Sequence, residues 1–186
     1  MNVQEQKDIG KELLDKLFIL CPSVVIAGGA ARDWYLGKEA RDLDIYLSYR
    51  PNQPTHNNGN IIADWLGLDQ SDFKVLGVQF DENIDQSENY AINPNVRCVY
   101  EFEYKGVTVQ IINMHTEYVD VNDFCLSICQ AWTTDCDTIN TTKDFEYSVK
   151  EKIIFKTGKI YLEKARYIDK MKSRFPDYLF FEVKPL

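Results

Sequence analysis

Two aspartates, Asp42 and Asp44, are separated by one residue within an apolar run formed by Leu43, Ile45 and Leu47. This alternation predicts a strand, and side chains at positions i and i+2 of a strand share a face. The two carboxylates are therefore expected to lie close together, where they repel each other unless a cation lies between them. Hard oxygen ligands of this kind suit Mg²⁺ (or Mn²⁺), which also accepts substrate phosphates as ligands. We predict that Asp42 and Asp44 are catalytic residues and bind this metal.

A glycine pair, Gly28 and Gly29, lies between a short β-branched run at 24–27 and a predicted helix at 30–36. A strand, a tight glycine turn and a helix N-terminus direct backbone N–H groups toward an anion, and glycine allows the backbone to approach that anion closely. A glycine pair alone is often only a turn, and paired aspartates alone are usually solvated. Their combination in one segment favours a site for a phosphate and a metal.

This segment resembles the signature G-G-x-V-R-D-x-L-L-G-x4-D-x-D-I of class II CCA-adding enzymes and bacterial poly(A) polymerases, which belong to the polymerase-β-type nucleotidyltransferase superfamily. The matching residues are Gly28, Gly29, Arg32, Asp33, Leu36, Gly37, Asp42, Leu43, Asp44 and Ile45. The resemblance implies an α+β nucleotidyltransferase (polymerase-β-like) fold: a mixed or antiparallel sheet of about five strands, flanked by helices, with a C-terminal helix. We expect a catalytic domain at 1–150 and a helical extension packed on it at 151–186.

The activity that the resemblance implies is a template-independent, metal-dependent transfer of a nucleoside monophosphate from a nucleoside triphosphate (NTP) to a hydroxyl, with release of pyrophosphate. The implied acceptor is the 3′ end of a tRNA or another RNA. In this interpretation the glycine pair cradles the β- and γ-phosphates, and Arg32 neutralises charge as pyrophosphate leaves. The nucleotide-binding residues would be Gly28, Gly29, Arg32, Asp33 and Arg41.

The family pattern often has a third carboxylate on a later strand, and here Gln110 occupies the corresponding position in the run 106–111. A neutral amide cannot act as a general base and is a poor ligand for a second metal. Glu101 and Glu103 alternate in phase on the neighbouring predicted strand, so either is a candidate for the missing charge. The plainer interpretation is that both belong to an exposed strand face.

Two arginines that help to hold the nucleotide in the family are replaced here by Val121 and Asn122, and we expect Asp123 to be a helix cap. Triphosphate affinity would then depend on Arg32 and on the helix at 164–174, which belongs to a basic C-terminal stretch at 156–174. In that stretch, apolar residues at helical spacing predict a helix. Its apolar face is formed by Tyr161, Ala165, Ile168, Met171 and Phe175, and another face by Arg166, Lys170 and Arg174. The basic face is either a contact surface for the acceptor or phosphates, or a solvated flank.

The chain has 186 residues and a formal net charge of −8, which together predict one acidic domain. An RNA-polymerising enzyme usually presents a broad positive surface. Two other interpretations therefore stay open. One is a small transferase of the toxin- or antibiotic-modifying kind, with a protein or small-molecule acceptor. The other is a catalytically degenerate protein that binds a nucleotide or a partner. The sequence leaves the oligomeric state open.

The five cysteines form no C-x-x-C pair, and His56 and His115 are far apart, so the sequence shows no zinc-ligand spacing. Cys125 and Cys129 are four residues apart in a predicted helix, where we expect buried small side chains. No apolar run approaches membrane-spanning length, and the N-terminal segment does not resemble a signal peptide. These features predict a reduced, cytoplasmic protein without a membrane partner.

The scaffold of the predicted site begins with an amphipathic helix at 3–20, which turns Ile9, Leu13, Leu17 and Leu20 toward the core. The two-residue period of 42–48 predicts the strand that carries the aspartates. The remaining expected elements are a loop at 49–59, a helix at 60–66, a strand at 73–80, an acidic insertion at 81–95, a hairpin of 96–104 with 107–114, a helix at 121–132 and a small hairpin at 137–149.

Overall fold

The computed structural model describes residues 1–48, 58–78, 95–157 and 165–185. Its main sheet has seven strands in the order β3-β4-β5-β2-β1-β6-β7, so the aspartate strand β2 is central. These strands are β1 Val25–Ala27, β2 Asp42–Ser48, β3 Lys74–Val78, β4 Val96–Tyr104, β5 Val107–Met114, β6 Ala131–Thr133 and β7 Asn140–Thr141. The pair β2 and β5 is parallel, and the other neighbours are antiparallel. The predicted α+β fold is confirmed, with more strands than the five expected.

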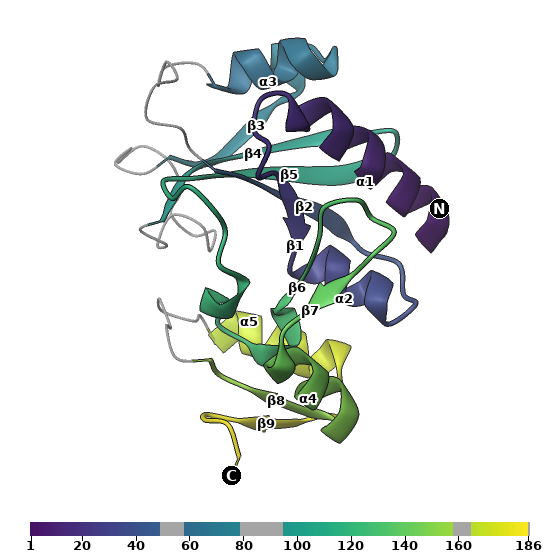
Figure 1. Cartoon of the computed structure of the whole chain (residues 1–186), viewed down its shortest axis with the longest axis vertical. Coiled ribbons are helices and arrows are strands. Elements are labelled where there is room, and N and C mark those ends of the chain that lie inside the picture. The colour runs from purple at the N-terminus through teal and green to yellow at the C-terminus, as the bar shows by residue number, and fades with distance from the viewer. Residues whose placement is uncertain (49–57, 79–94, 158–164, 186) are drawn as a thin grey trace.

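The helices are α1 Val3–Phe18, α2 Gly29–Tyr35, α3 Asn58–Leu66, α4 Lys143–Glu151 and α5 Ala165–Arg174. Figure 1 shows α1 and α3 beside the main sheet, and α4 and α5 at the other end of the molecule. A second, parallel sheet of β8 Ile153–Phe155 and β9 Leu179–Phe181 lies at that end. No helix within the described residues is long and apolar enough to cross a membrane.

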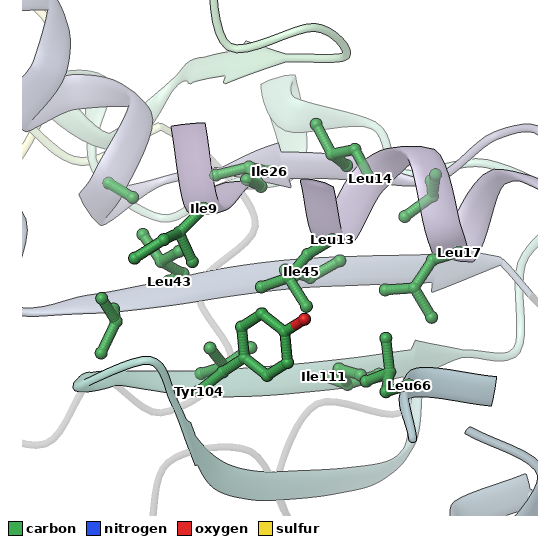
Figure 2. Packing of buried hydrophobic residues seen from close by; sticks show 14 of the residues in the cluster. Ile9, Leu13, Leu14, Leu17, Ile26, Leu43, Ile45, Leu66, Tyr104 and Ile111 are labelled. Atoms are coloured by element: carbon green, nitrogen blue, oxygen red, sulfur yellow. The ribbon is translucent and has the colours of Figure 1, made fainter. Parts of the chain in front are cut away.

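Helix α1 covers the face of the sheet opposite the aspartates. The helix begins with a capping box between Asn2 and Glu5. Its side chains Leu13 and Leu17 are fully buried against the sheet, where Ile45 of β2 is also fully buried (Figure 2). One hydrophobic cluster therefore lies on the side of β2 that faces α1. Asp42 and Asp44 lie on the other side, which also holds a second apolar cluster that includes Val99 and Ile112. Leu20 lies beyond the end of the helix at Phe18 and is half-buried, but it still packs against this core, as predicted.

The helix predicted at 121–132 is wrong. The segment forms short 3-10 turns at Val121–Asp123 and Ser127–Cys129 and then strand β6, which pairs with β1. The buried hydroxyl of Ser127 interacts with the Ser148 hydroxyl at 2.6 Å and accepts a hydrogen bond from the Phe155 amide at 3.1 Å. These long-range hydrogen bonds, rather than the backbone hydrogen bonds of a helix, hold the segment in place. Asp123 does not start a helix, because the residue that caps the first turn is Asp120.

The small hairpin predicted at 137–149 is also wrong beyond the two-residue strand β7. Thr142 caps α4 by accepting a hydrogen bond from the Phe145 amide at 3.1 Å, and Phe145 is fully buried. Helix α5 spans Ala165–Arg174, and residues 153–155 pair with β9 as a strand. The loop predicted at 49–59 lies outside the described residues up to 57, and its last two residues begin α3. Residues 81–94 of the acidic insertion and 158–164 of the basic stretch also lie outside the described residues.

Candidate functional site

The two aspartates share one face of β2, as predicted. Leu43 and Ile45 are fully buried, whereas Asp42 and Asp44, which alternate with them along the strand, are half-buried. The burial pattern alternates with the two-residue period of a strand. Both carboxylates therefore lie on the face that α1 does not cover.

On this face, the strand register places side chains of β2, β5 and β4 in rows that run across the three strands. One row is Asp44, Gln110 and Glu101; the row beside it is Asp42, Thr108 and Glu103. The next row toward the carboxyl end of β2 is apolar and consists of Tyr46, Ile112 and Val99. Because directly paired residues project to the same side of a sheet, the face changes from apolar to polar between Tyr46 and Asp44.

Side-chain hydrogen bonds link the polar rows. The Gln110 amide Nε2 donates to Glu101 Oε2 at 2.7 Å, and Thr108 Oγ1 donates to Glu103 Oε1 at 2.6 Å. On β3, Lys74 Nζ lies 3.9 Å from Glu101 Oε1. The position expected for a third carboxylate thus holds a buried amide that is directly bonded to a glutamate on the next strand.

The glycine turn brings its second residue close to Asp44. A Cβ atom built on Gly29 would lie 3.9 Å from Asp44 Oδ2 and 3.9 Å from Arg32 Nη2. Gly28 has φ 78° and ψ −120°, a conformation that is strained for a residue with a side chain. Its N–H donates to the carbonyl of Ala131 at 2.9 Å. The Gly28 amide therefore bonds to β6, and Gly29 is the residue of the pair that lies beside Asp44. The role of the glycine pair in holding phosphates stays a prediction.

We predict that Gly28→Ala lowers the free energy of unfolding by about 1–3 kcal/mol, because a residue with a Cβ is strained at this backbone conformation. The added methyl would also lie 3.4 Å from the Phe124 ring. Urea unfolding measures the change. Gly37→Ala is the comparison. It is strained as well, because Gly37 also has a positive φ (67°), but no atom lies within 4 Å of its built Cβ, so it should cost less than Gly28→Ala. A Gly28→Ala protein as stable as the wild type would contradict the prediction.

Arg32 and Asp33 form a buried ion pair beneath the glycine turn. Arg32 Nε lies 2.8 Å from Asp33 Oδ1, and Arg32 Nη2 lies 3.2 Å from Asp33 Oδ2. Arg174 of α5 also donates to Asp33 Oδ2. Arg32 Nη1 faces Cys129 Sγ and Met171 Sδ, each at 3.7 Å. One carboxylate is thus shared by two guanidinium groups.

This cluster changes the roles open to three of the predicted residues. The side chains of Arg32 and Asp33 are only 6% and 3% exposed, so direct contact between Asp33 and a nucleotide does not fit its position. Arg174, predicted as an acceptor or phosphate contact, is instead engaged with Asp33 and with the Glu39 carbonyl. Arg32 Nη2 lies 3.9 Å from a Cβ built on Gly29, so its charge is close to the glycine turn.

Two further predicted cations lie near the aspartates. Arg41 Nη2 forms an ion pair with Asp42 Oδ2 at 2.5 Å. Burial and the nearby Arg41 charge lower the pKa of Lys170 from its usual value, while Asp42 and Asp44 act in the opposite direction. Lys170 on α5 therefore lies within electrostatic range of both aspartates. Arg166 belongs to the first turn of α5, and its side chain is outside the described part of the structure.

The donor set around the aspartates fits a hard divalent cation with few protein ligands. In the part of the chain that the structure describes, no group of three or more His, Cys, Asp or Glu side chains could hold a metal. Asp42 and Asp44 supply oxygen ligands, and Mg²⁺ is commonly bound by one or two carboxylates together with waters and substrate phosphates. The residues present therefore fit such an ion when a triphosphate completes its coordination.

Two aromatic residues of the site were not predicted from the sequence. Tyr46 follows Asp44 by two residues on the same face, and burial, together with the Asp44 charge, raises the pKa of Tyr46 above its usual value. Its ring packs against the Phe124 ring in a tilted arrangement, with 5.5 Å between centroids and an interplanar angle of 36°. The period of β2 was a sufficient signal for Tyr46, whereas Phe124 reaches the glycine turn only through the tertiary fold.

Solved structures of similar fold come from tRNA-processing enzymes. The structure "tRNA-processing enzyme (apo form I)" is 14% identical and covers 94% of this chain and 43% of its own, with a TM-score of 0.57. A complex of a CCA-adding enzyme with ATP is 16% identical and covers 94% of this chain and 39% of its own, with a TM-score of 0.56. Apo form II of a CCA-adding enzyme is 14% identical and covers 96% and 42%, with a TM-score of 0.55.

These likenesses show the nucleotidyltransferase fold that the sequence predicted. The chain spans about two fifths of the length of these solved proteins. No family model matches the chain, and no curated protein matches it.

Proposed function

We propose that this protein is a metal-dependent nucleotidyltransferase that moves a nucleoside monophosphate from an NTP to a hydroxyl acceptor. The observation that carries the proposal is the approach of the glycine turn to the aspartate pair, with a built Cβ on Gly29 only 3.9 Å from Asp44 Oδ2. A phosphate chain on this turn would therefore lie against two carboxylates that can hold its counter-ion. The nucleotidyltransferase fold, shared with solved structures of tRNA-processing enzymes, supports the same conclusion.

In the reaction, the acceptor oxygen attacks the α-phosphorus, the bond to the bridging oxygen of pyrophosphate breaks, and the hydroxyl proton is released. Asp42 and Asp44 would hold Mg²⁺ (or Mn²⁺), which when bound stabilises charge on the phosphates. Gly29 lets the phosphate chain approach the backbone. Arg32, fixed by Asp33, and Lys170 provide positive charge around the leaving pyrophosphate. Phosphoryl transfer of this kind depends mainly on positioning and electrostatics.

We propose a hydroxyl compound as the acceptor, without specifying its class. An RNA 3′ end is the acceptor suggested by the solved tRNA-processing enzymes of similar fold. The net charge of −8 favours a protein or a small molecule instead. Nucleotide binding without transfer is the outcome expected of a degenerate site, which Gln110 at the third position would favour.

Transfer of label from α-³²P-NTPs tests the proposal directly. We expect Mg²⁺-dependent label on one of three acceptors: an RNA with a free 3′ hydroxyl, protein in a cell extract, or a pool of hydroxylated small molecules. The protein with Asp8→Asn/Asp15→Asn, two exposed positions on α1, should label the same acceptor as the wild type. Absence of label on all three, with any of the four NTPs, would contradict transferase activity.

A further inference from the structure

Glu101 occupies a defined place in the candidate site that neither the fold nor the aspartate motif assigns. It lies in the row Asp44, Gln110, Glu101 across three adjacent strands. Gln110, between the two acids, is 8% exposed, and its Nε2 donates to Glu101 Oε2 at 2.7 Å. The row therefore contains two carboxylates separated by one buried amide.

The direction of this hydrogen bond is fixed by chemistry. An ionised carboxylate only accepts hydrogen bonds, whereas a glutamine amide has one donor end and one acceptor end. Glu101 therefore selects the NH2 end of Gln110 for itself. The amide oxygen of Gln110 is therefore the end that does not bond to Glu101, and the residue in register with Gln110 on its other side is Asp44.

We propose that Glu101 is a positioning residue that sets the Gln110 amide with its oxygen toward Asp44, so that the two residues together take the place of a third carboxylate. The inference rests on the proposed function. Gln110 then offers a neutral oxygen to the cation or to the acceptor hydroxyl, and Glu101 provides negative charge one strand further away. Residues that orient metal ligands in this way typically contribute 10–100-fold, as an order of magnitude, to metal affinity or activity.

Glu103 is less suited to this role, although it shares the strand and the face. Its partner is the Thr108 hydroxyl, at 2.6 Å, and its own row ends at Asp42. Lys74 also approaches Glu101, at 3.9 Å, but the Lys74 side chain is 66% exposed and such a pair is weak. The hydrogen bond to Gln110 is therefore the interaction that fixes Glu101.

Mn²⁺ titration followed by electron paramagnetic resonance, with a non-hydrolysable ATP analogue present, tests the inference without requiring turnover. Glu101→Gln should weaken Mn²⁺ binding by about 10-fold or more, because the neutral amide removes the charge and no longer fixes the orientation of Gln110. Its unfolding midpoint in urea should stay near that of the wild type. Glu146→Gln is the control, since Glu146 accepts one side-chain bond, from Thr141 at 2.9 Å, on α4.

The exchange variant Glu101→Gln/Gln110→Glu separates positioning from a purely structural role. It keeps an amide-to-carboxylate hydrogen bond and moves the charge one strand nearer to Asp44. We expect it to restore Mn²⁺ affinity to within a few-fold of the wild type, or to exceed it. With a known acceptor, kcat should be lowest for Glu101→Gln and should return toward the wild-type value in the exchange variant. KM for the NTP should change less than kcat.

Each outcome distinguishes the inference from the proposed function. Wild-type Mn²⁺ binding that Glu101→Gln leaves unchanged would overturn the role of Glu101 and leave the transferase proposal standing. A folded exchange variant that binds Mn²⁺ no better than Glu101→Gln would overturn it as well. If the wild type bound no Mn²⁺, the inference would fail, and the label-transfer assay would decide the function separately.

Discussion

Asp42→Ala/Asp44→Ala should lose Mg²⁺-dependent binding of ATP, CTP, GTP and UTP and should reduce nucleotidyl transfer by at least about 1000-fold. Metal ions stabilise the transition state of such transfers by several kcal/mol, and each 1.36 kcal/mol, roughly, is a factor of ten in rate. The two carboxylates share the half-buried polar face of the central strand β2. Calorimetric titration with each NTP measures binding, and α-³²P label measures transfer.

The fold should survive this double substitution. The aspartates repel each other, and one interaction that the change removes is the ion pair of the half-buried Asp42 with the exposed Arg41, worth about 1 kcal/mol. Asp8→Asn/Asp15→Asn removes the same number of negative charges from exposed positions on α1 and should bind nucleotides as the wild type does. If the Asp42→Ala/Asp44→Ala protein kept magnesium-dependent binding, the metal site would have to lie elsewhere.

Asp33→Ala should lower the free energy of unfolding by about 3–5 kcal/mol, because removal of one partner leaves a buried charge without compensation. The Asp33 side chain is 3% exposed and is shared by Arg32 and Arg174. Within the described residues, Arg174 Nε is already buried without a hydrogen-bond partner. Urea unfolding followed by circular dichroism measures the change.

A surface ion pair provides the comparison for Asp33→Ala. Asp144 pairs with Lys184 at 2.6 Å, with side chains 33% and 51% exposed, so Asp144→Ala should cost about 1 kcal/mol or less. A similarly small loss for Asp33→Ala would mean that Arg32 is stabilised without its neighbour. In that case the buried cluster could not be what holds α5 against the glycine turn.

Local patterns in the sequence predicted the parts of the site that lie on one strand. The alternation of 42–48 placed Asp42 and Asp44 on one face. The resemblance in the run at 106–111 put Gln110 at the position of the third carboxylate, and the structure places it in register with Asp44. The contact of Asp33 with Arg174 joins residues 141 positions apart, and no local pattern carries that information. The roles of Arg32, Lys170 and the two aspartates in binding and catalysis stay predictions.

Errors arose where tertiary bonds outweighed local periodicity. Apolar spacing at 121–132 fits a helix, but the Ser127 hydroxyl interacts with Ser148 and Phe155, and β6 pairs with β1. In α4, the alternation of Phe145 and Tyr147 with acidic residues resembles a strand. The Thr142 cap and the burial of Phe145 favour the helix instead.

The polar rows lie on β2, β5 and β4, which are interior strands of the main sheet. A change in loop length does not alter this surface, because its residues are fixed by the pairing of interior strands. A one-residue slip in that register would exchange Gln110 for an apolar neighbour beside Asp44. If the proposed function holds, the chemistry of the site and the choice of acceptor are separable traits. Loops around the polar rows could then change to accept another acceptor while the paired strands keep Asp42, Asp44 and Gln110 in place.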